Sequence, residues 1–388
     1  MDLYILDALL RRTTLIDKFI SVIWTERFDE YGDFELIVES TASNRALLIE
    51  DVLLACSKSN YVMKIKTVED SVDEEGRPTL KLTGNSLEEI LEDRAAFADL
   101  DDLTTVPTWD ITDPPADVAR QIFHDICVTG ILDLNDIIPM VTEGSFLPAD
   151  TIPEPVDDIT VNLAPTTVGQ AIKDIVKANA LGFRLVRQDD PPQLYFDVYA
   201  GSDRTSSQTT LGAVIFTPEL DNLQDTTELN TNDGFKNVAY VFGPAGFETV
   251  FAPSADPEVA GYERRVLVII ADDITSENPD VSSAMIRRGE EELAKHQAVQ
   301  AFDGTVDQNS KYVYGLDYFL GDVVEMRNKD SATNIMRVTE QIFSQDENGE
   351  KAYPTLSINK FIAPGSWLAW KNQQHWDELT TEEWADLP

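Results

Sequence analysis

Two segments far apart in the chain have the sequence pattern of the same β-hairpin. They span residues 61–82 and 334–358. In each, an apolar strand that contains a Met leads into an acidic turn with a Gly, and a second strand with Pro-Thr-Leu follows. Alternating apolar residues on both sides of such a turn are typical of a hairpin.

The spacing inside the two segments also agrees. Met63 precedes Gly76 by the same offset that separates Met336 from Gly349, and only the stretch between Gly and Pro-Thr-Leu differs in length. An internal repeat constrains the architecture more than any single motif does. We therefore expect two related β domains, against the alternative that apolar alternation around an acidic turn recurs by chance.

The chain is strongly acidic. It has 70 acidic and 30 basic residues among 388, a formal net charge of −40. Such a surface repels nucleic acid phosphates and anionic lipids, which argues against a DNA- or RNA-binding protein. The charge fits three roles: simple solubility, an acid-biased host, or a surface past which nucleic acid slides without sticking.

The start of the chain and its two cysteines bear on its compartment. No basic region precedes an apolar run at the N-terminus, so no secretory signal is expected, and no apolar run is long enough to cross a bilayer. Cys56 and Cys127 fit a reducing compartment without disulfides, and both are expected to be small buried groups. We expect synthesis in the cytoplasm and no membrane span.

Hydrophobic periodicity predicts an α+β fold in which antiparallel strand pairs dominate. The expected helices are residues 41–51 with Ser43 or Asn44 as cap, 86–94 with a Ser86–Glu89 capping box, 115–128, 167–179 and 281–297. The expected strands, besides the two hairpins, are residues 3–12, 15–24, 34–38, 183–186, 194–199, 213–217, 237–242, 265–270, 302–306 and 323–327.

Composition divides the chain further. Arg120 is the only lysine or arginine between Ala95 and Ala171, a stretch that is rich in proline. With a length that suits about two to four domains, we expect a small inserted domain or a long surface excursion there. The predicted segments are a first β-barrel domain at 1–95, the acidic insertion at 96–165, a small α/β domain at 166–235, a second β-barrel domain at 236–362, and a tail at 363–388.

The C-terminal tail concentrates tryptophan in a polar, acidic segment. Four of the six tryptophans lie there: Trp367, Trp370, Trp376 and Trp384. Terminal segments seldom make a core of their own, and Trp is a favoured anchor at protein interfaces. Two interpretations stay open, packing back on the body of the protein or docking on a partner.

No motif for catalysis or metal binding is visible. Phosphate-binding and dinucleotide-binding glycine patterns are missing, as are zinc-protease and serine-hydrolase motifs. His124, His296 and His375 are scattered, and the two cysteines lack the spacing of a zinc site. The acidic turns lack the last ligand of a calcium-binding loop, and hairpin chemistry explains them better. We expect no enzyme, no cofactor and no metal.

Several blocks in a fixed order resemble the minor tail, or tail-hub, proteins of phages with long non-contractile tails. The blocks lie between residues 3 and 358, and the segment 95–164 and the tail lie outside the resemblance. The residues that carry it are Trp24, Glu26, Arg27, Gly32, Phe34, Leu36, Gly84, Arg94, Gly201, Asn237, Gly289, Gly315, Asp317, Leu320, Gly321 and Asp322. The resemblance implies a structural role for these residues.

The resemblance also implies an architecture like that of a baseplate hub. Such hubs have two antiparallel β-barrel-type domains per chain and smaller α/β domains between them. Three chains form a ring in which six barrels are nearly equivalent, so that a six-fold tail tube meets a three-fold tip. The implied partners are two further copies of the chain, the tail tube or distal tail protein ring, and tail-tip or fibre proteins. Phage DNA would pass through without specific binding.

The implied location is the tail tip of the virion, after assembly in the host cytoplasm, with no lysin domain attached. Two other functions compete with this one. A host-surface adhesin would bind through the acidic insertion or the Trp-rich tail. A tail-associated cell-wall hydrolase would need a nucleophile or a pair of acids in a cleft.

Overall fold

A computed structural model of the chain divides into two compact units, which are described separately. The first unit comprises Met1–Gln224 and Thr305–Pro388, and the second comprises Asp225–Gly304. The structure describes residues 1–72, 76–97, 109–143, 158–231, 234–244, 246–252, 258–271, 274, 281–296, 299–306, 312–327 and 333–358. The Trp-rich tail predicted at 363–388 lies outside these residues.

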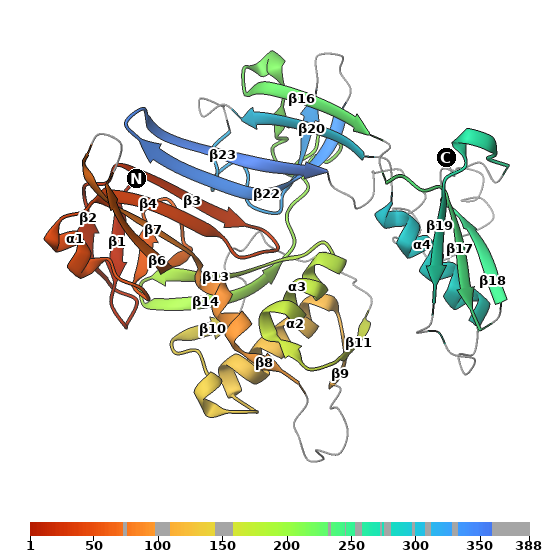
Figure 1. Cartoon of the computed structure of the whole chain (residues 1–388), viewed down its shortest axis with the longest axis horizontal. Coiled ribbons are helices and arrows are strands. Elements are labelled where there is room, and N and C mark those ends of the chain that lie inside the picture. Colours follow the sequence, from red (N-terminus) through yellow and green to blue (C-terminus); the bar gives the residue numbers. More distant parts are fainter. Residues whose placement is uncertain are drawn as a thin grey trace. The chain divides into compact units, whose positions relative to one another are not determined.

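The first unit is built on one sheet of 11 strands (Figure 1). Its strands are antiparallel except for the pair β15–β21. The order along the sheet is β15 (Ile215–Phe216), β21 (Val323–Arg327), β22 (Thr333–Asp346), β3 (Ser21–Arg27), β4 (Asp33–Glu39), β7 (Pro78–Ser86), β6 (Val62–Val72), β5 (Leu53–Cys56), β1 (Leu3–Leu6) and β2 (Arg12–Ile16), and β23 (Gly349–Ile358) pairs with β22.

Both predicted hairpins exist, and both belong to this sheet. The first is β6–β7 and the second is β22–β23. The register shifts between Ile65 and Thr67 in the first hairpin and between Val338 and Glu340 in the second. Each hairpin therefore has a β-bulge at the third residue after its Met, a correspondence that supports an internal repeat.

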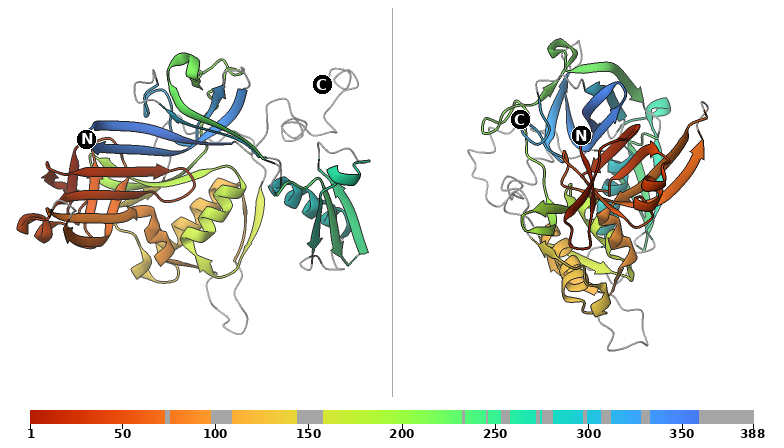
Figure 2. Two further views of the ribbon diagram at one scale, coloured as in Figure 1. Left: turned by 45° about the horizontal axis from the view of Figure 1, so that its top comes forward. Right: turned by 90° about the vertical axis from the view of Figure 1, so that its left-hand side faces the viewer.

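A single long strand connects the two halves of the sheet. One edge of β22 pairs with β23, while its opposite edge pairs first with β21 and then with β3. The views in Figures 1 and 2 show β22 and β23 running beside β3. The described strands form no closed barrel, so the two β-barrel-type domains stay a proposal. The predicted mixture of helices with mainly antiparallel strand pairs is confirmed, in a structure where strands predominate.

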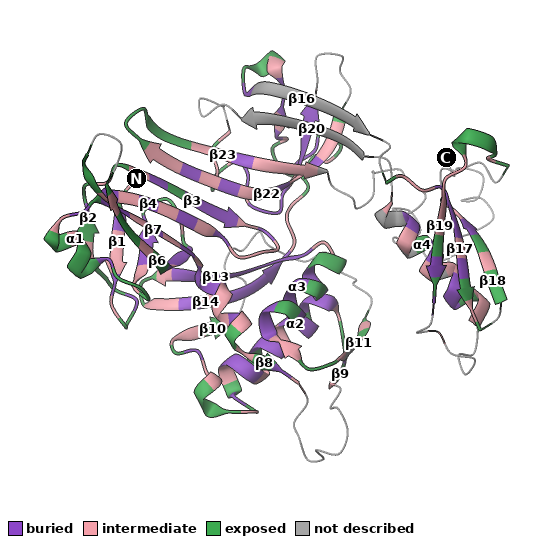
Figure 3. Ribbon diagram, viewed as in Figure 1, coloured by how far each residue is buried: buried purple, intermediate pink, exposed green. Residues whose placement is uncertain are grey.

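The sheet buries alternate side chains, as a half-buried strand should. Phe34, Leu36 and Val38 of β4 are buried, as the alternation predicts, and they pack in one core with Trp24 of β3 and Met63 of β6. Figure 3 shows this alternation along β4 and β22. The core therefore lies on one face of the N-terminal strands.

A second core lies among helices and short sheets of the same unit. Two helices pack on the hairpin β13–β14, and Phe123 stacks on Phe196 with ring centroids 3.8 Å apart. The elements are η1 (Leu87–Asp93), β8 (Ala95–Ala96), β9 (Trp109–Asp113), α2 (Pro115–Phe123), the π-helical turn η2 (His124–Thr129), η3 (Leu134–Asp136), β10 (Val141–Glu143), β11 (Ile159–Leu163), β12 (Thr166–Thr167), α3 (Val168–Ala178), β13 (Gly182–Asp189), β14 (Pro192–Tyr199) and η4 (Pro218–Leu220).

Two predicted helix starts are wrong in detail. The helix α1 (Ala42–Leu47) is capped by Thr41, whose side chain accepts a hydrogen bond from the N–H of Asn44, and not by Ser43 or Asn44. The segment after Ser86 is a 3-10 helix, and Ser86 makes no capping bond within it. Its hydroxyl oxygen instead accepts a hydrogen bond from the N–H of Gly32 at 2.7 Å, because the turn between β3 and β4 presents a buried donor there.

The second unit is a three-stranded sheet covered by one helix. The helix α4 (Val281–Lys295) packs on β17 (Val238–Gly243), β18 (Gly246–Phe251) and β19 (Val266–Ile270), with η5 (Gly261–Glu263) before β19. Met285 and Leu293 of the helix and Val241 of the sheet are core residues. Separately, β16 (Leu223–Thr231) and β20 (Val299–Val306) form a two-stranded sheet.

The structure divides into two compact units, whereas the sequence predicted five segments. The five-segment division stays a proposal. Residues of α2, from the predicted insertion, share a core with α3, from the predicted α/β domain. Cys56 and Cys127 are buried and form no disulfide, as expected. Among the described residues, no helix is long and apolar enough to span a bilayer.

Candidate functional site

Half of the sixteen residues singled out in the sequence meet where the end of β3 contacts the C-terminal part of the first unit. Arg27 lies at the end of β3 and makes three links. Its Nε donates to Glu340 of β22 at 2.7 Å, its Nη2 donates to Asp33 of β4 at 2.6 Å, and its Nη1 donates to the carbonyl of Tyr31. One side chain thus holds β3, β4 and β22 together. We call the region around it, residues 26–28, 182–204, 314–322 and 337, the central junction.

Glu26, one residue before Arg27, is buried in this junction. Only 2% of its surface is exposed, and Tyr314 donates its hydroxyl hydrogen to Glu26 Oε2 at 2.6 Å. The two residues line a cavity of about 210 Å³ together with Tyr61, Arg184 and Tyr199. The guanidinium of Arg184 pairs with buried Asp197 at 2.6 Å and lies over the ring of Tyr199. The cavity wall is therefore both polar and aromatic.

Burial changes the protonation of two carboxyl groups near this cavity. It raises the pKa of Glu26 to about 7, although hydrogen bonds from Ser59 and Tyr314 act in the opposite direction. It also raises the pKa of Glu88 to about 7, and Glu88 Oε1 accepts the N–H of Leu185 at 2.9 Å. Both carboxyls are thus largely protonated below neutral pH.

The stability of the fold should therefore fall as pH rises through 7. The pKa of Glu26 and Glu88 in the folded chain lies above the unfolded value, so their contribution is fully present below the unfolded pKa and is lost as pH rises through the folded one. The wild-type free energy of unfolding should fall between about pH 5 and about pH 8. In Glu26→Gln, we expect this decrease to be smaller by about 1–3 kcal/mol. Urea unfolding followed by circular dichroism measures it.

A matched variant keeps this test specific. Glu219→Gln changes an exposed acid of the same unit and should leave the wild-type pH profile unchanged. Equal pH profiles for Glu26→Gln and wild type would contradict a protonated Glu26 in the folded state.

Asp322 organises the other side of the junction. Its carboxylate accepts hydrogen bonds from Arg204 Nε at 2.5 Å, from the N–H of Phe319 at 2.9 Å and from the N–H of Ser202 at 2.8 Å. Asp322 is only 2% exposed, and burial raises its pKa in spite of these donors. The chain after β14 is thereby fixed to the start of β21.

Two glycines permit the close approach of these segments. A Cβ at Gly201 would stand 1.8 Å from the carbonyl oxygen of Gly321, so the two backbones touch at this point. Gly321 has a φ of +86°, and a Cβ there would stand 2.3 Å from the ring of Phe28. The ring of Phe28 is also 5.4 Å from that of Tyr199 and lies under Arg337. The glycines of the motif are thus required by packing and backbone conformation.

The remaining singled-out residues have structural positions of several kinds. Gly32 and Gly84 lie where a Cβ would meet the backbone of Thr25 and of Lys64, at 2.1 Å and 1.9 Å. Trp24 and Leu320 are buried, and the guanidinium of Arg94 contacts Asp136. Gly315 has a φ of +81°, and the side chain of Asp317 accepts a hydrogen bond from the N–H of Val313. In the second unit, the side chain of Asn237 accepts a hydrogen bond from the N–H of Arg265, and Gly289 packs against Val250. Asn237 and Gly289 belong to the second unit and not to the central junction.

Sequence reasoning missed a second polar network in the first unit. Lys173 of α3 is 8% exposed and pairs with Glu92 of η1 at 2.6 Å. Its ammonium also donates to the hydroxyl of Tyr31, and Thr167 donates to Glu92. These side chains bind η1 and α3 to the β3–β4 turn. The sequence contained one indication of this network, which is that Lys173 lies on an otherwise apolar face of the predicted helix 167–179.

The geometry is that of a structural junction. The polar side chains mainly satisfy one another across strands that are distant in sequence, and among the described residues no group of three or more His, Cys, Asp or Glu side chains could hold a metal ion. No catalytic, cofactor-binding or metal-binding residue is assigned from these contacts.

The chain matches the family model described as Siphovirus ReqiPepy6 Gp37-like protein over residues 2–356. A search among curated proteins found no match.

Three solved structures are similar to the chain as a whole. The 43 kDa tail protein of prophage MuSo2 from Shewanella oneidensis has a TM-score of 0.57 at 12% identity, covering 92% of this chain and 98% of that one. The tail protein from Neisseria meningitidis MC58 has a TM-score of 0.56 at 12% identity, covering 92% and 96%. The prophage tail protein gp18 from Listeria monocytogenes EGD-e has a TM-score of 0.51 at 12% identity, covering 93% and 96%.

At 12% identity, the solved structures show that the chain shares their fold and nothing more. The family model, in contrast, matches nearly the whole chain, residues 2–356. The chain therefore belongs to the Siphovirus ReqiPepy6 Gp37-like protein family.

Proposed function

We propose that this chain is the hub subunit at the tip of a long non-contractile phage tail. Three copies form a ring, which joins a six-fold tail tube or distal tail protein ring to a three-fold tip. Tail-tip or fibre proteins attach below the ring. Phage DNA leaves through the centre without specific binding, and the ring assembles in the host cytoplasm before it becomes part of the virion.

The internal repeat is the observation that carries this proposal. The hairpins β6–β7 and β22–β23 have bulges at the same offset from Met63 and Met336, and both belong to one sheet. Three copies of such a chain offer six similar hairpins. A ring of three chains can then offer six similar contacts to six-fold neighbours, and head-to-tail contacts between the chains can close such a ring.

The negative charge supports a channel for DNA. With a formal net charge of −40, the chain has few cations to hold phosphates, and a wall with few lysines or arginines lets DNA pass without binding. We infer that part of the acid excess faces the axis of the ring. A map of the acids in an assembled ring tests this point, and an excess confined to the outer surface would contradict it.

The native mass of the purified chain tests the ring. Light scattering should give three times the subunit mass of 43.3 kDa over a wide range of concentrations. Cross-linking followed by denaturing electrophoresis should show a ladder that stops at three chains. A folded monomer at every concentration would overturn a self-assembling ring.

A further inference from the structure

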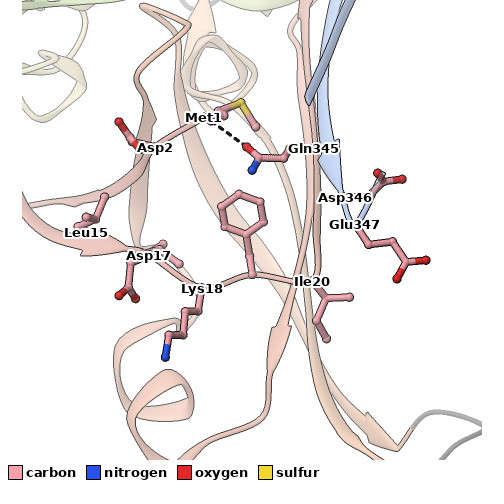
Figure 4. A pocket seen from close by; sticks show the side chains of 11 residues that line it. Met1, Asp2, Leu15, Asp17, Lys18, Ile20, Gln345, Asp346 and Glu347 are labelled. Atoms are coloured by element: carbon pink, nitrogen blue, oxygen red, sulfur yellow. Dashed lines mark hydrogen bonds between the residues drawn. The ribbon is translucent and has the colours of Figure 1, made fainter. Parts of the chain in front are cut away.

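A pocket of about 600 Å³ lies at one end of the large sheet, apart from the central junction. Its walls come from the first two residues, from residues 15–20 before β3, and from residues 345–347 at the tip of the β22–β23 hairpin (Figure 4). The N-terminal ammonium donates to Gln345 Oε1 at 2.8 Å and closes one wall. The volume is within the range of about 300–1,000 Å³ that is usual for pockets that bind small molecules.

The pocket offers apolar surface that no described residue covers. Leu15 is 49% exposed and Ile20 is 50% exposed, although both are large hydrophobic residues. Ile16 and Phe19 line the pocket between them. Apolar side chains that gather in a concave place and stay exposed are typical of a surface that binds a partner.

The rim of the pocket is acidic. Asp2, Asp17, Asp346 and Glu347 line it, against Lys18 and the N-terminal ammonium, which pairs with Glu350 outside the lining. Figure 4 labels these four acidic side chains among the residues that line the pocket. Within the described part of the chain, none of the four carboxylates pairs with a basic side chain. Their charge is therefore available to a ligand.

The hairpin turn explains how two of these acids reach the rim. The carboxylate of Asp346 accepts the N–H of Asn348 at 2.7 Å, a bond that shapes the turn, and Gly349 adopts a φ of +115°. Glu347 makes no such bond and extends from the turn. The geometry of the turn explains why Asp346, Asn348 and Gly349 occur at these positions. It does not explain Glu347, whose side chain makes no bond that shapes the turn.

We propose that this pocket binds a basic segment with an apolar anchor, supplied by a partner protein and not by another copy of this chain. The apolar floor accepts one or two large hydrophobic side chains, and the acidic rim attracts lysines or arginines beside them. Charge complementarity at this rim argues against a second copy as the occupant, because the chain has 70 acids and only 30 bases. The proposal is independent of the trimeric ring, since all of the lining residues belong to one chain.

Selection from a random 12-residue peptide library against the full-length protein tests the proposal. We expect enrichment of peptides with a Leu, Ile, Phe or Trp next to two or more Lys or Arg. Binding of one enriched peptide, measured by fluorescence anisotropy, should weaken about tenfold in Asp17→Lys/Glu347→Lys. It should also weaken between about 0.1 M and about 1 M salt.

Two further variants separate the apolar and charged parts. Leu15→Ser removes exposed apolar surface and should weaken the same peptide. Asp174→Lys/Glu219→Lys reverses two exposed charges that do not line the pocket and should leave affinity within about twofold. Enrichment of acidic peptides similar to residues 363–388, or equal binding by the pocket variant and the control, would overturn the proposal. An absence of any enriched family would overturn it as well.

Discussion

Replacing Asp322 by Ala should destabilise the first unit by about 3–5 kcal/mol. The change leaves the buried guanidinium of Arg204 without its carboxylate and removes the acceptor for the N–H groups of Ser202 and Phe319. Breaking one side of a buried ion pair costs more than removing the whole pair, because an uncompensated charge stays inside. Urea unfolding followed by circular dichroism measures the loss.

The neighbouring Asp203 provides the control. Its side chain is exposed and accepts one hydrogen bond, from the N–H of Thr205, so Asp203→Ala should cost about 1 kcal/mol or less. In a double-mutant cycle, Arg204→Met should recover part of the stability lost in Asp322→Ala. Equal losses for Asp322→Ala and Asp203→Ala would show that the buried pair does not hold the junction.

Replacing Gly201 by Ala should be comparably severe, at about 3 kcal/mol or more. The new Cβ would stand 1.8 Å from the carbonyl oxygen of Gly321 and 2.4 Å from the backbone nitrogen of Asp322. Backbone atoms cannot turn away as a flexible side chain can. The chain around Gly321 must shift as a whole, and the contacts of Phe28 and Asp322 shift with it.

Gly212→Ala is the matched control for this backbone contact. No atom lies within 4 Å of a Cβ at Gly212, so the variant should match wild type or gain about 0.4–1 kcal/mol through a less flexible unfolded chain. Thermal unfolding of both variants gives the comparison. A Gly201→Ala protein as stable as Gly212→Ala would mean that the two segments do not touch as described.

Local patterns predicted local structure well. The alternation in β4, the helix from 167 to 179 and both hairpins follow from spacing of apolar residues over a few positions, and the structure has α3 at Val168–Ala178. The helix cap at residues 41–44 was wrong by two or three residues, because several neighbouring side chains can serve as the cap. The predicted cap at Ser86 was wrong for a different reason. The Ser86 hydroxyl accepts a hydrogen bond from the N–H of Gly32, which is 54 residues away in sequence.

Long-range pairing could not be predicted in the same way. The sequence gives two hairpins but does not reveal that β22 pairs with β3 and so joins both hairpins in one sheet. That pairing depends on contacts between Arg27 and Glu340, which are separated by 313 positions. Separation into two barrels was therefore an inference from the resemblance, and it stays a proposal.

The candidate site shows the same division. The resemblance selected Glu26, Arg27 and Asp322, and the structure brings all three into the central junction. It could not select Lys173 or Arg184, because a single basic residue among apolar neighbours gives no indication of its buried partner. The raised pKa of Glu26 was also beyond the sequence, since burial causes it.

Electron cryomicroscopy of the virion tail that contains this chain tests the central claim most directly. We expect three copies in one ring at the tip, with both β-hairpins of each copy facing the six-fold tube above and acidic side chains facing the channel. Six copies in the ring, or a position along the tube or on the outside of the tail, would contradict the hub.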